Sequence, residues 1–253
     1  MTERVKCGIG VVTATAVLAT LAGCGGSPRH AVAPRPSAAC AAGSVRHVRR
    51  ANVAWAAVAL RPLNAFREPG RHVISHFGIV NVNRFPTVFG VLEERVDRQC
   101  RATWLRVGLP LRPNGITGWI RAGAVDEAPV RAHVVVDLSS RRARVYRGGV
   151  LVLTTSAAIG SSATPTPLGR YYVNQRLVPA DPHGPFGPGA VGVSAFSPVL
   201  TGWAQGGPIA IHGTNEPWSI GRAVSNGCIR VPNAVLRRLW PIAIAGTPVD
   251  IRA

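Results

Sequence analysis

The chain has 253 residues, of which 47% are hydrophobic, and its formal net charge is +18. This apolar content supports one or two folded domains and excludes a wholly disordered protein. Lys6 is the only lysine, so arginine carries almost all of the positive charge. Such a field favours anionic partners, although an arginine-biased surface that only keeps the protein soluble is an alternative. No basic–aromatic recognition motif accompanies the charge, so we expect no nucleic-acid partner.

The N-terminus has the pattern of a secretory signal. Arg4 and Lys6 precede an apolar run from Gly8 to Leu21, which is too short to predict a membrane-spanning helix. At the end of this run lies Leu21-Ala22-Gly23-Cys24, a segment that resembles the bacterial lipobox. We therefore expect residues 1–23 to be a lipoprotein signal peptide and Cys24 to be the lipidated N-terminus of an extracytoplasmic, membrane-anchored protein. The alternative is an ordinary cleaved signal with an incidental cysteine.

Residues 24–44 are rich in Gly, Pro, Ala and Ser and show no hydrophobic period, which predicts a flexible tether. Residues 45–126 contain short apolar runs separated by turn signals, which predicts a small all-β domain. The runs 103–107 and 117–120, with the Asn114-Gly115 turn between them, predict a β-hairpin. With the segment 63–70, this region resembles bacterial SH3-like modules. That resemblance implies either a wall-binding domain or a rigid spacer.

Residues 130–253 predict a second, predominantly β domain. Strand-like runs cover 133–138, 144–146 and 150–155, and Gly148-Gly149 predicts a tight turn between the last two. Val235, Leu236 and Leu239 are spaced for one apolar face of a short helix over 232–240. The segment 248–251 predicts a final strand.

One histidine and one cysteine in the second domain have the setting of a catalytic pair. The chain contains Ile211-His212-Gly213-Thr214 and, after a loop, Ser225-Asn226-Gly227-Cys228-Ile229-Arg230. A thiol with an ordinary pKa of about 8.5 needs a base or a cation to become a nucleophile at neutral pH, and His212 can serve as that base. Gly227 permits a tight turn that leaves the sulfur uncrowded, while backbone N–H groups beside it can stabilise an oxyanion.

These two segments resemble the catalytic signature of the L,D-transpeptidases, in which His-Gly precedes a Ser/Thr-x-Gly-Cys-hydrophobic-Arg/Asn segment. The resemblance extends through the segments 132–138, 164–171 and 187–192 and covers about half of the chain. It implies a predominantly β fold with a short helix: an L,D-transpeptidase-type β-sandwich, here preceded by a small SH3-like β-barrel. Many members carry a second histidine where this chain has Asn226, which leaves substrate contacts at that position open.

The resemblance implies a cysteine acyltransferase that acts on peptidoglycan stem peptides without a cofactor. Cys228 is the implied nucleophile, His212 the general acid and base, and the Gly213 carbonyl the group that orients the imidazole. The backbone at Gly227 is the implied oxyanion donor, and the residues implied to contact substrate are Ser225, Asn226 and Arg230. Ser225 as a turn cap and Arg230 in a structural ion pair are alternatives.

The same sequence features are compatible with two other functions. An L,D-carboxypeptidase would use water at the same site in place of an acceptor amine. A non-catalytic wall-binding lipoprotein would use the SH3-like module and the positive charge, with anionic wall polymers as partners. The presence of both His212 and Cys228 argues against the second alternative. The sequence shows no spacing typical of a zinc site, and it does not indicate an oligomeric state.

The remaining cysteines can be assigned by elimination. Cys7 leaves with the signal, Cys24 takes the lipid, and Cys228 has to stay reduced to act. Cys40 and Cys100 are left, and in an oxidising compartment two such cysteines are expected to pair. A disulfide that closes a loop of 60 residues stabilises the fold by about 4 kcal/mol in the chain-entropy account.

Overall fold

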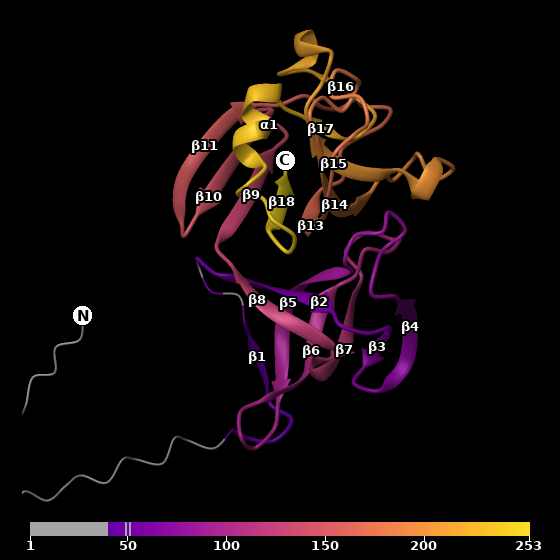
Figure 1. Cartoon of the computed structure of the whole chain (residues 1–253), viewed down its shortest axis with the longest axis vertical. Coiled ribbons are helices and arrows are strands. Elements are labelled where there is room, and N and C mark those ends of the chain that lie inside the picture. The colour runs from indigo at the N-terminus through magenta and orange to yellow at the C-terminus, as the bar shows by residue number, and fades with distance from the viewer. Residues whose placement is uncertain (1–39, 49, 51) are drawn as a thin grey trace, which may run out of the picture. The chain divides into compact units, whose positions relative to one another are not determined.

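The computed structural model describes residues 40–48, 50 and 52–253. The predicted signal peptide, the predicted lipidation site Cys24 and most of the predicted tether lie outside these residues. Within the described part of the chain, no helix is long and apolar enough to cross a membrane. The described residues belong to one compact unit that contains two large β-sheets (Figure 1).

The N-terminal sheet has eight strands in the order β4-β3-β7-β6-β5-β2-β8, with β1 paired to β5. The 3₁₀ turn η1 (Ala122–Ala124) connects β7 to β8. Alternate residues of the strands face a core that contains the fully buried Phe89, Leu105 and Ile120. The strands are β1 (Val45–His47), β2 (Ala54–Ala59), β3 (Leu63–Glu68), β4 (Arg71–Phe77), β5 (Val88–Val96), β6 (Ala102–Gly108), β7 (Thr117–Arg121) and β8 (Val125–Val130).

The predicted hairpin is present as β6 and β7, which pair antiparallel with Trp104 opposite Arg121. Its connection is longer than a two-residue turn, because the whole segment 109–116 separates the strands. Asn114 does not act only in a turn: its Oδ1 accepts from Phe196 N at 2.9 Å and its Nδ2 donates to Phe196 O at 2.8 Å. The side chain thereby links this loop to the second sheet.

The disulfide expected from the sequence is present between Cys40 and Cys100. Cys100 follows β5, so the bond attaches the start of the described chain to the N-terminal sheet. The all-β character of this region agrees with the sequence pattern, and its assignment as an SH3-like module stays a prediction.

The C-terminal sheet also has eight strands, in the order β11-β10-β9-β18-β13-β14-β15-β17. A separate pair, β12 (Ile159–Gly160) and β16 (Ala223–Ser225), lies beside it. The strands are β9 (Ala132–Asp137), β10 (Arg142–Arg147), β11 (Val150–Ser156), β13 (Gly169–Leu177), β14 (Ala190–Phe196), β15 (Pro208–His212), β17 (Ile229–Arg230) and β18 (Pro248–Arg252). The 3₁₀ turns η2 (Ala204–Gly206) and η3 (Pro217–Ser219) flank β15.

The last strand of the chain lies inside this sheet. Figure 1 shows β18 between β9 and β13; it runs parallel to β9 and antiparallel to β13. The predicted β10–β11 hairpin is present, and both glycines of its turn have positive φ, 60° at Gly148 and 85° at Gly149, as a type I′ turn requires. The helix α1 (Asn233–Leu239) buries Leu236 and Leu239 in the core. The predominantly β fold with one short helix is therefore confirmed.

Candidate active site

The strand register brings His212 and Cys228 to one face of the C-terminal sheet. β15 and β17 are parallel neighbours, with Ile211 opposite Ile229 and His212 opposite Arg230. Both isoleucines are fully buried in the core. Because successive residues of a strand face opposite sides, His212 and Arg230 face away from that core, and so does Cys228, two residues before Arg230.

The His212 ring is buried and held in one orientation. Its side chain belongs to a residue only 3% exposed, and its Nδ1 lies 2.5 Å from Gly213 O. A carbonyl oxygen only accepts, so Nδ1 carries the proton and Nε2 remains as the acceptor. The Phe186 ring packs edge-on against the imidazole with centroids 5.0 Å apart. Sequence reasoning missed Phe186.

Burial lowers the pKa of His212 to about 4, because desolvation penalises the imidazolium. The hydrogen bond to Gly213 raises this pKa and the Arg230 charge lowers it, both by less than the effect of burial. His212 is therefore neutral at neutral pH, which is the protonation state that a general base requires.

Asn233, at the start of α1, fixes the backbone next to His212. Its Oδ1 accepts from Thr214 N at 2.7 Å and its Nδ2 donates to Thr214 O at 3.0 Å. A Cβ atom at Gly213 would lie 2.3 Å from the Asn233 Oδ1, so no larger residue fits there without displacing that side chain. Gly213 thus serves the site both through its carbonyl and through its lack of a side chain.

Cys228 is partly exposed and is the free cysteine of the described residues. Burial raises the pKa of its thiol, while a backbone hydrogen bond at Ala210 and the Arg230 charge lower that pKa to a smaller extent. The sulfur lies 3.8 Å from Pro208 O, which accepts from the thiol. The pair therefore consists of a protonated thiol and a neutral imidazole when no substrate is bound.

Ser225 shapes the turn that presents the sulfur. Its Oγ donates to Cys228 O at 2.6 Å and accepts from Gly227 N at 3.2 Å. Gly227 has φ of 108°, a conformation that favours glycine. Ser225 is buried, whereas Asn226 is exposed at the tip of the turn.

Two threonines from a distant loop brace this turn. Thr164 Oγ1 donates to Ser225 O at 2.9 Å, and Thr166 Oγ1 donates to Gly227 O at 2.8 Å. Thr166 Oγ1 also accepts from Gly160 N at 2.9 Å. The segment 164–171 was noted in the sequence as part of the family pattern, but its contact with the cysteine turn was not foreseen.

Arg230 forms an ion pair with Glu216, so the Glu216 carboxylate partly compensates the charge of its guanidinium. The Arg230 Nε atom is buried and has no hydrogen-bond partner within the described chain. The charge of the guanidinium also lowers the pKa of both His212 and Cys228. Glu216 gave no signal in the sequence.

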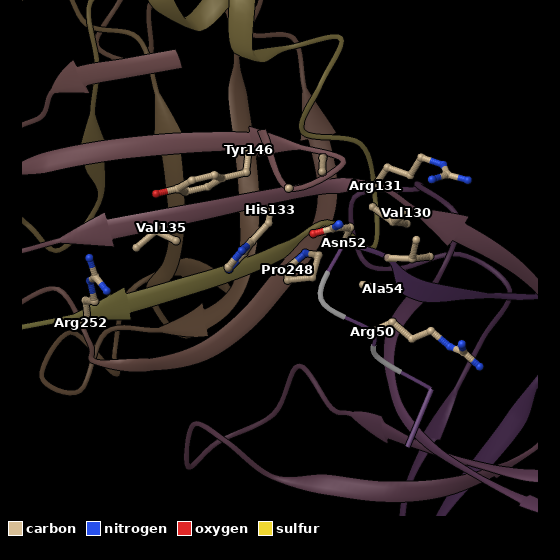
Figure 2. Close-up of a pocket in the computed structure, with 13 residues that line it drawn as sticks. Arg50, Asn52, Ala54, Val130, Arg131, His133, Val135, Tyr146, Pro248 and Arg252 are labelled. Atoms are coloured by element: carbon tan, nitrogen blue, oxygen red, sulfur yellow. The ribbon is translucent and has the colours of Figure 1, made fainter. Parts of the chain in front are cut away.

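A separate cavity of about 290 Å³, shown in Figure 2, lies near the start of β9. It is lined by neither His212 nor Cys228. The guanidinium groups of Arg50, Arg131 and Arg252 end far apart in Figure 2, so they do not converge on one anion. Across residues 40–48, 50 and 52–253, no three His, Cys, Asp or Glu side chains gather as metal ligands would.

Residues 131–251 match the family model of the L,D-transpeptidase catalytic domain. The YkuD protein of Bacillus licheniformis, whose name assigns it to the L,D-transpeptidases, is 39% identical over 126 residues, which are 50% of this chain and 67% of that protein. The YkuD protein of Bacillus subtilis is 34% identical over 129 residues, 51% of this chain and 71% of the relative. The chain belongs to the L,D-transpeptidase family.

Solved L,D-transpeptidase structures also resemble the chain. An L,D-transpeptidase structure from Mycobacterium smegmatis matches with a TM-score of 0.42 at 18% identity. The match covers 66% of this chain and 90% of the Mycobacterium smegmatis chain. A variant of the Enterococcus faecium L,D-transpeptidase matches with a TM-score of 0.34 at 23% identity. This match covers 48% of this chain and 49% of the Enterococcus faecium chain. This chain therefore spans about half of the Enterococcus faecium chain.

Within this L,D-transpeptidase, the family match includes all of the predicted residues of the acyl-transfer site. The structure places them at the end of β15 and in the segment that runs from the end of β16 through β17. The partners that sequence reasoning missed come from elsewhere: Phe186, Thr166, Glu216 and Asn233 lie in four separate segments. Each of them contacts a predicted residue or its immediate neighbour.

Proposed function

We propose that this protein is a peptidoglycan L,D-transpeptidase that cross-links the third residues of two stem peptides through a thioester at Cys228. The observation that carries the proposal is the hydrogen bond of 2.5 Å between His212 Nδ1 and Gly213 O. It leaves the basic nitrogen of a neutral imidazole on the face of the sheet that carries the free thiol.

In the first half of the reaction, the sulfur attacks the carbonyl that precedes the terminal D-alanine of a tetrapeptide stem. The thiol and the imidazole are both neutral before the attack, so the thiol proton passes to His212 Nε2 as the sulfur attacks. The imidazolium then returns this proton to the leaving amine. D-Alanine departs, and the stem remains bound to Cys228 as a thioester.

In the second half, a side-chain amine of another stem attacks the thioester carbonyl. Neutral His212 accepts the proton of that amine, and the sulfur leaves and takes the proton back as the thiol. Water in place of the amine would give L,D-carboxypeptidase activity at the same site. Both outcomes use the same two residues, so the product distinguishes them.

The backbone around the sulfur is suited to hold the oxyanion of each tetrahedral intermediate. The Gly227 N–H already donates to Ser225 Oγ at 3.2 Å, so we assign the main donor role to the Cys228 N–H. Ser225 positions the turn. Arg230 keeps the site together through Glu216, and its positive charge makes it our candidate for binding a stem carboxylate.

A peptidoglycan substrate places this enzyme outside the cytoplasmic membrane. The lipobox-like segment that ends in Cys24 suits an anchor there, with a tether that reaches the wall. The net charge of +18 suits contact with anionic wall polymers. Replacement of Cys24 by alanine should release the protein from membranes, and retention after a salt wash would contradict the lipid anchor.

The test of the reaction is mass spectrometry of products after incubation with purified tetrapeptide stems. Cross-linked dimers that have lost one D-alanine support transpeptidation. Tripeptides without dimers would assign carboxypeptidase activity instead. Absence of both products, with a folded protein, would contradict the proposed function.

A further inference from the structure

A second cavity, of about 370 Å³, is lined by residues of both sheets and of the loops between their strands. One wall is the loop 78–87 that connects β4 to β5 of the N-terminal sheet, and the other is formed by β13, by the end of β14 and by η2. Pro208 lines this cavity, and its carbonyl oxygen is the atom 3.8 Å from the Cys228 sulfur. The cavity and the Cys228 sulfur therefore share one neighbouring residue, Pro208.

Amide side chains from the two sheets are joined to one another in the wall of this cavity. Asn83 Nδ2 donates to Gln175 Oε1 at 3.1 Å and to Gln205 Oε1 at 3.2 Å. Gln205 Nε2 donates back to Asn83 Oδ1 at 2.8 Å, and Asn81 Nδ2 donates to Gln175 Oε1 at 2.9 Å. The loop is thus held against β13 and η2 by hydrogen bonds that cross from one sheet to the other.

This lining differs chemically from the surface of the rest of the chain. The net charge is +18, yet none of the described residues that line the cavity is an arginine or a carboxylate. Phe77, Phe196 and aliphatic groups supply most of the remaining surface, together with His76 and Thr87. Asn174 also lines the cavity, and its Oδ1 is buried without a hydrogen-bond partner in the described chain.

An apolar cavity with a few neutral amides matches a ligand that has the same character. A secondary amide offers one N–H and one C=O, which pair with carboxamide oxygens and nitrogens, and its substituents can pack against aromatic rings. Among the described residues, no arginine lines the cavity to pair directly with a desolvated carboxylate, so the lining suits a neutral amide better than an anionic group. Peptidoglycan carries secondary amides both in its stems and in the N-acetyl groups of its sugars.

We propose that this cavity is a substrate subsite for a secondary amide of peptidoglycan and that the loop 78–87 forms one of its walls. The proposal rests on the proposed function, because it assigns the cavity to the substrate that reacts at Cys228. It gives the N-terminal sheet a part in substrate selection. Asn83 and Gln205 are positioning residues of this subsite, and they lie outside the acyl-transfer machinery.

The experiment compares steady-state kinetics of Asn83→Ala and Gln205→Ala with wild type in the full chain. Each loses hydrogen bonds of the amide wall, so we expect KM for a tetrapeptide muropeptide to rise roughly threefold to tenfold while kcat stays within about twofold. Gln99→Ala is the matched control, because Gln99 is an exposed amide in the turn between β5 and β6 and does not line the cavity. It should leave both constants unchanged.

Two substrates identify the source of the amide. If the rise in KM appears with a free tetrapeptide, the cavity takes a peptide amide; if it appears only with the disaccharide-linked stem, the cavity takes an N-acetyl amide. Acylation by a carbapenem, followed by intact mass, reports folding and the state of Cys228 in every variant. Unchanged KM in both variants, with normal acylation and wild-type turnover, would overturn the subsite and leave the proposed function standing. Should one variant fail to acylate, the other decides.

Discussion

The two halves of the acyl-transfer site are held by different chemistry. On the histidine side, the ring is buried, its Nδ1 bonds to the Gly213 carbonyl, and the Asn233 carboxamide fixes the next residue by two hydrogen bonds. On the cysteine side, the sulfur is partly exposed, and three hydroxyls, those of Ser225, Thr164 and Thr166, brace the turn that carries it.

This difference shows how each half meets its own requirement. A base needs one fixed tautomer, and burial against a backbone carbonyl provides it without a carboxylate. A nucleophile needs access to substrate. Hydroxyl groups therefore hold the backbone of its turn by hydrogen bonds, and the cysteine itself stays partly exposed. Substitutions on the histidine side should therefore act on proton transfer, and substitutions on the cysteine side should act on the placement of the sulfur.

The largest effect is expected at the nucleophile itself. Cys228→Ala should abolish product, because no other thiol is available in the described part of the chain. Cys228→Ser should also be nearly inactive, since a hydroxyl is far less acidic than a thiol and the His212 ring has a carbonyl partner instead of a carboxylate. Product analysis by mass spectrometry checks both. Substantial turnover by either variant would place the nucleophile elsewhere.

Loss of the base should have the next largest effect. His212→Asn should lower kcat by at least about 100-fold and leave KM nearly unchanged, because general base catalysis acts in the transition state. Steady-state kinetics with tetrapeptide stems measures this. A large rise in KM with unchanged kcat would instead assign His212 to substrate binding.

An effect of comparable size is expected on stability at acid pH. The pKa of His212 is about 4 in the folded protein and about 6.5 in the unfolded chain, so the unfolded state binds an extra proton between these values. The contribution of His212 to the free energy of unfolding should be fully present above pH 6.5, and about 3 kcal/mol of it should be lost as the pH drops to 4. Urea unfolding of wild type and His212→Asn measures it. An equal acid loss in the variant would contradict the buried neutral ring.

A smaller effect is expected where the cysteine turn is braced. Thr166→Val keeps the shape of the side chain but removes the hydrogen bonds to Gly227 O and Gly160 N, which should lower kcat roughly tenfold. Thr155→Val is the matched control, because Thr155 is a buried threonine of β11 whose hydroxyl bonds to Ser156 O. Equal loss of activity in both variants would indicate general destabilisation instead of a role in placing the sulfur.

The sequence predicts local features of the fold and the central residues of the site. The Gly148-Gly149 hairpin and the helix with Leu236 and Leu239 follow from turn chemistry and periodicity. His212 and Cys228 are recognisable because their neighbours form a spaced motif. The position of β18 inside the sheet is not predictable in this way, since parallel pairing with β9 joins the two ends of the domain and leaves no local signal.

The supporting contacts of the site are hidden for the same reason. Thr166 and Gly227 are 61 positions apart, and Asn233 and Thr214 are 19 apart, so no local pattern links them. The interpretation of Arg230 also depends on a partner, Glu216, whose type alone suggests only a surface charge. Residue types show which groups can react, whereas the tertiary fold decides which groups hold them in place.

The central claim, that acyl groups pass through the Cys228 sulfur under control of His212, is tested most directly by intact mass after treatment with a carbapenem. We predict one adduct on wild type, slower formation of the same adduct on His212→Asn, and none on Cys228→Ala. An adduct that persists in Cys228→Ala, or one that forms on His212→Asn at the wild-type rate, would contradict the account.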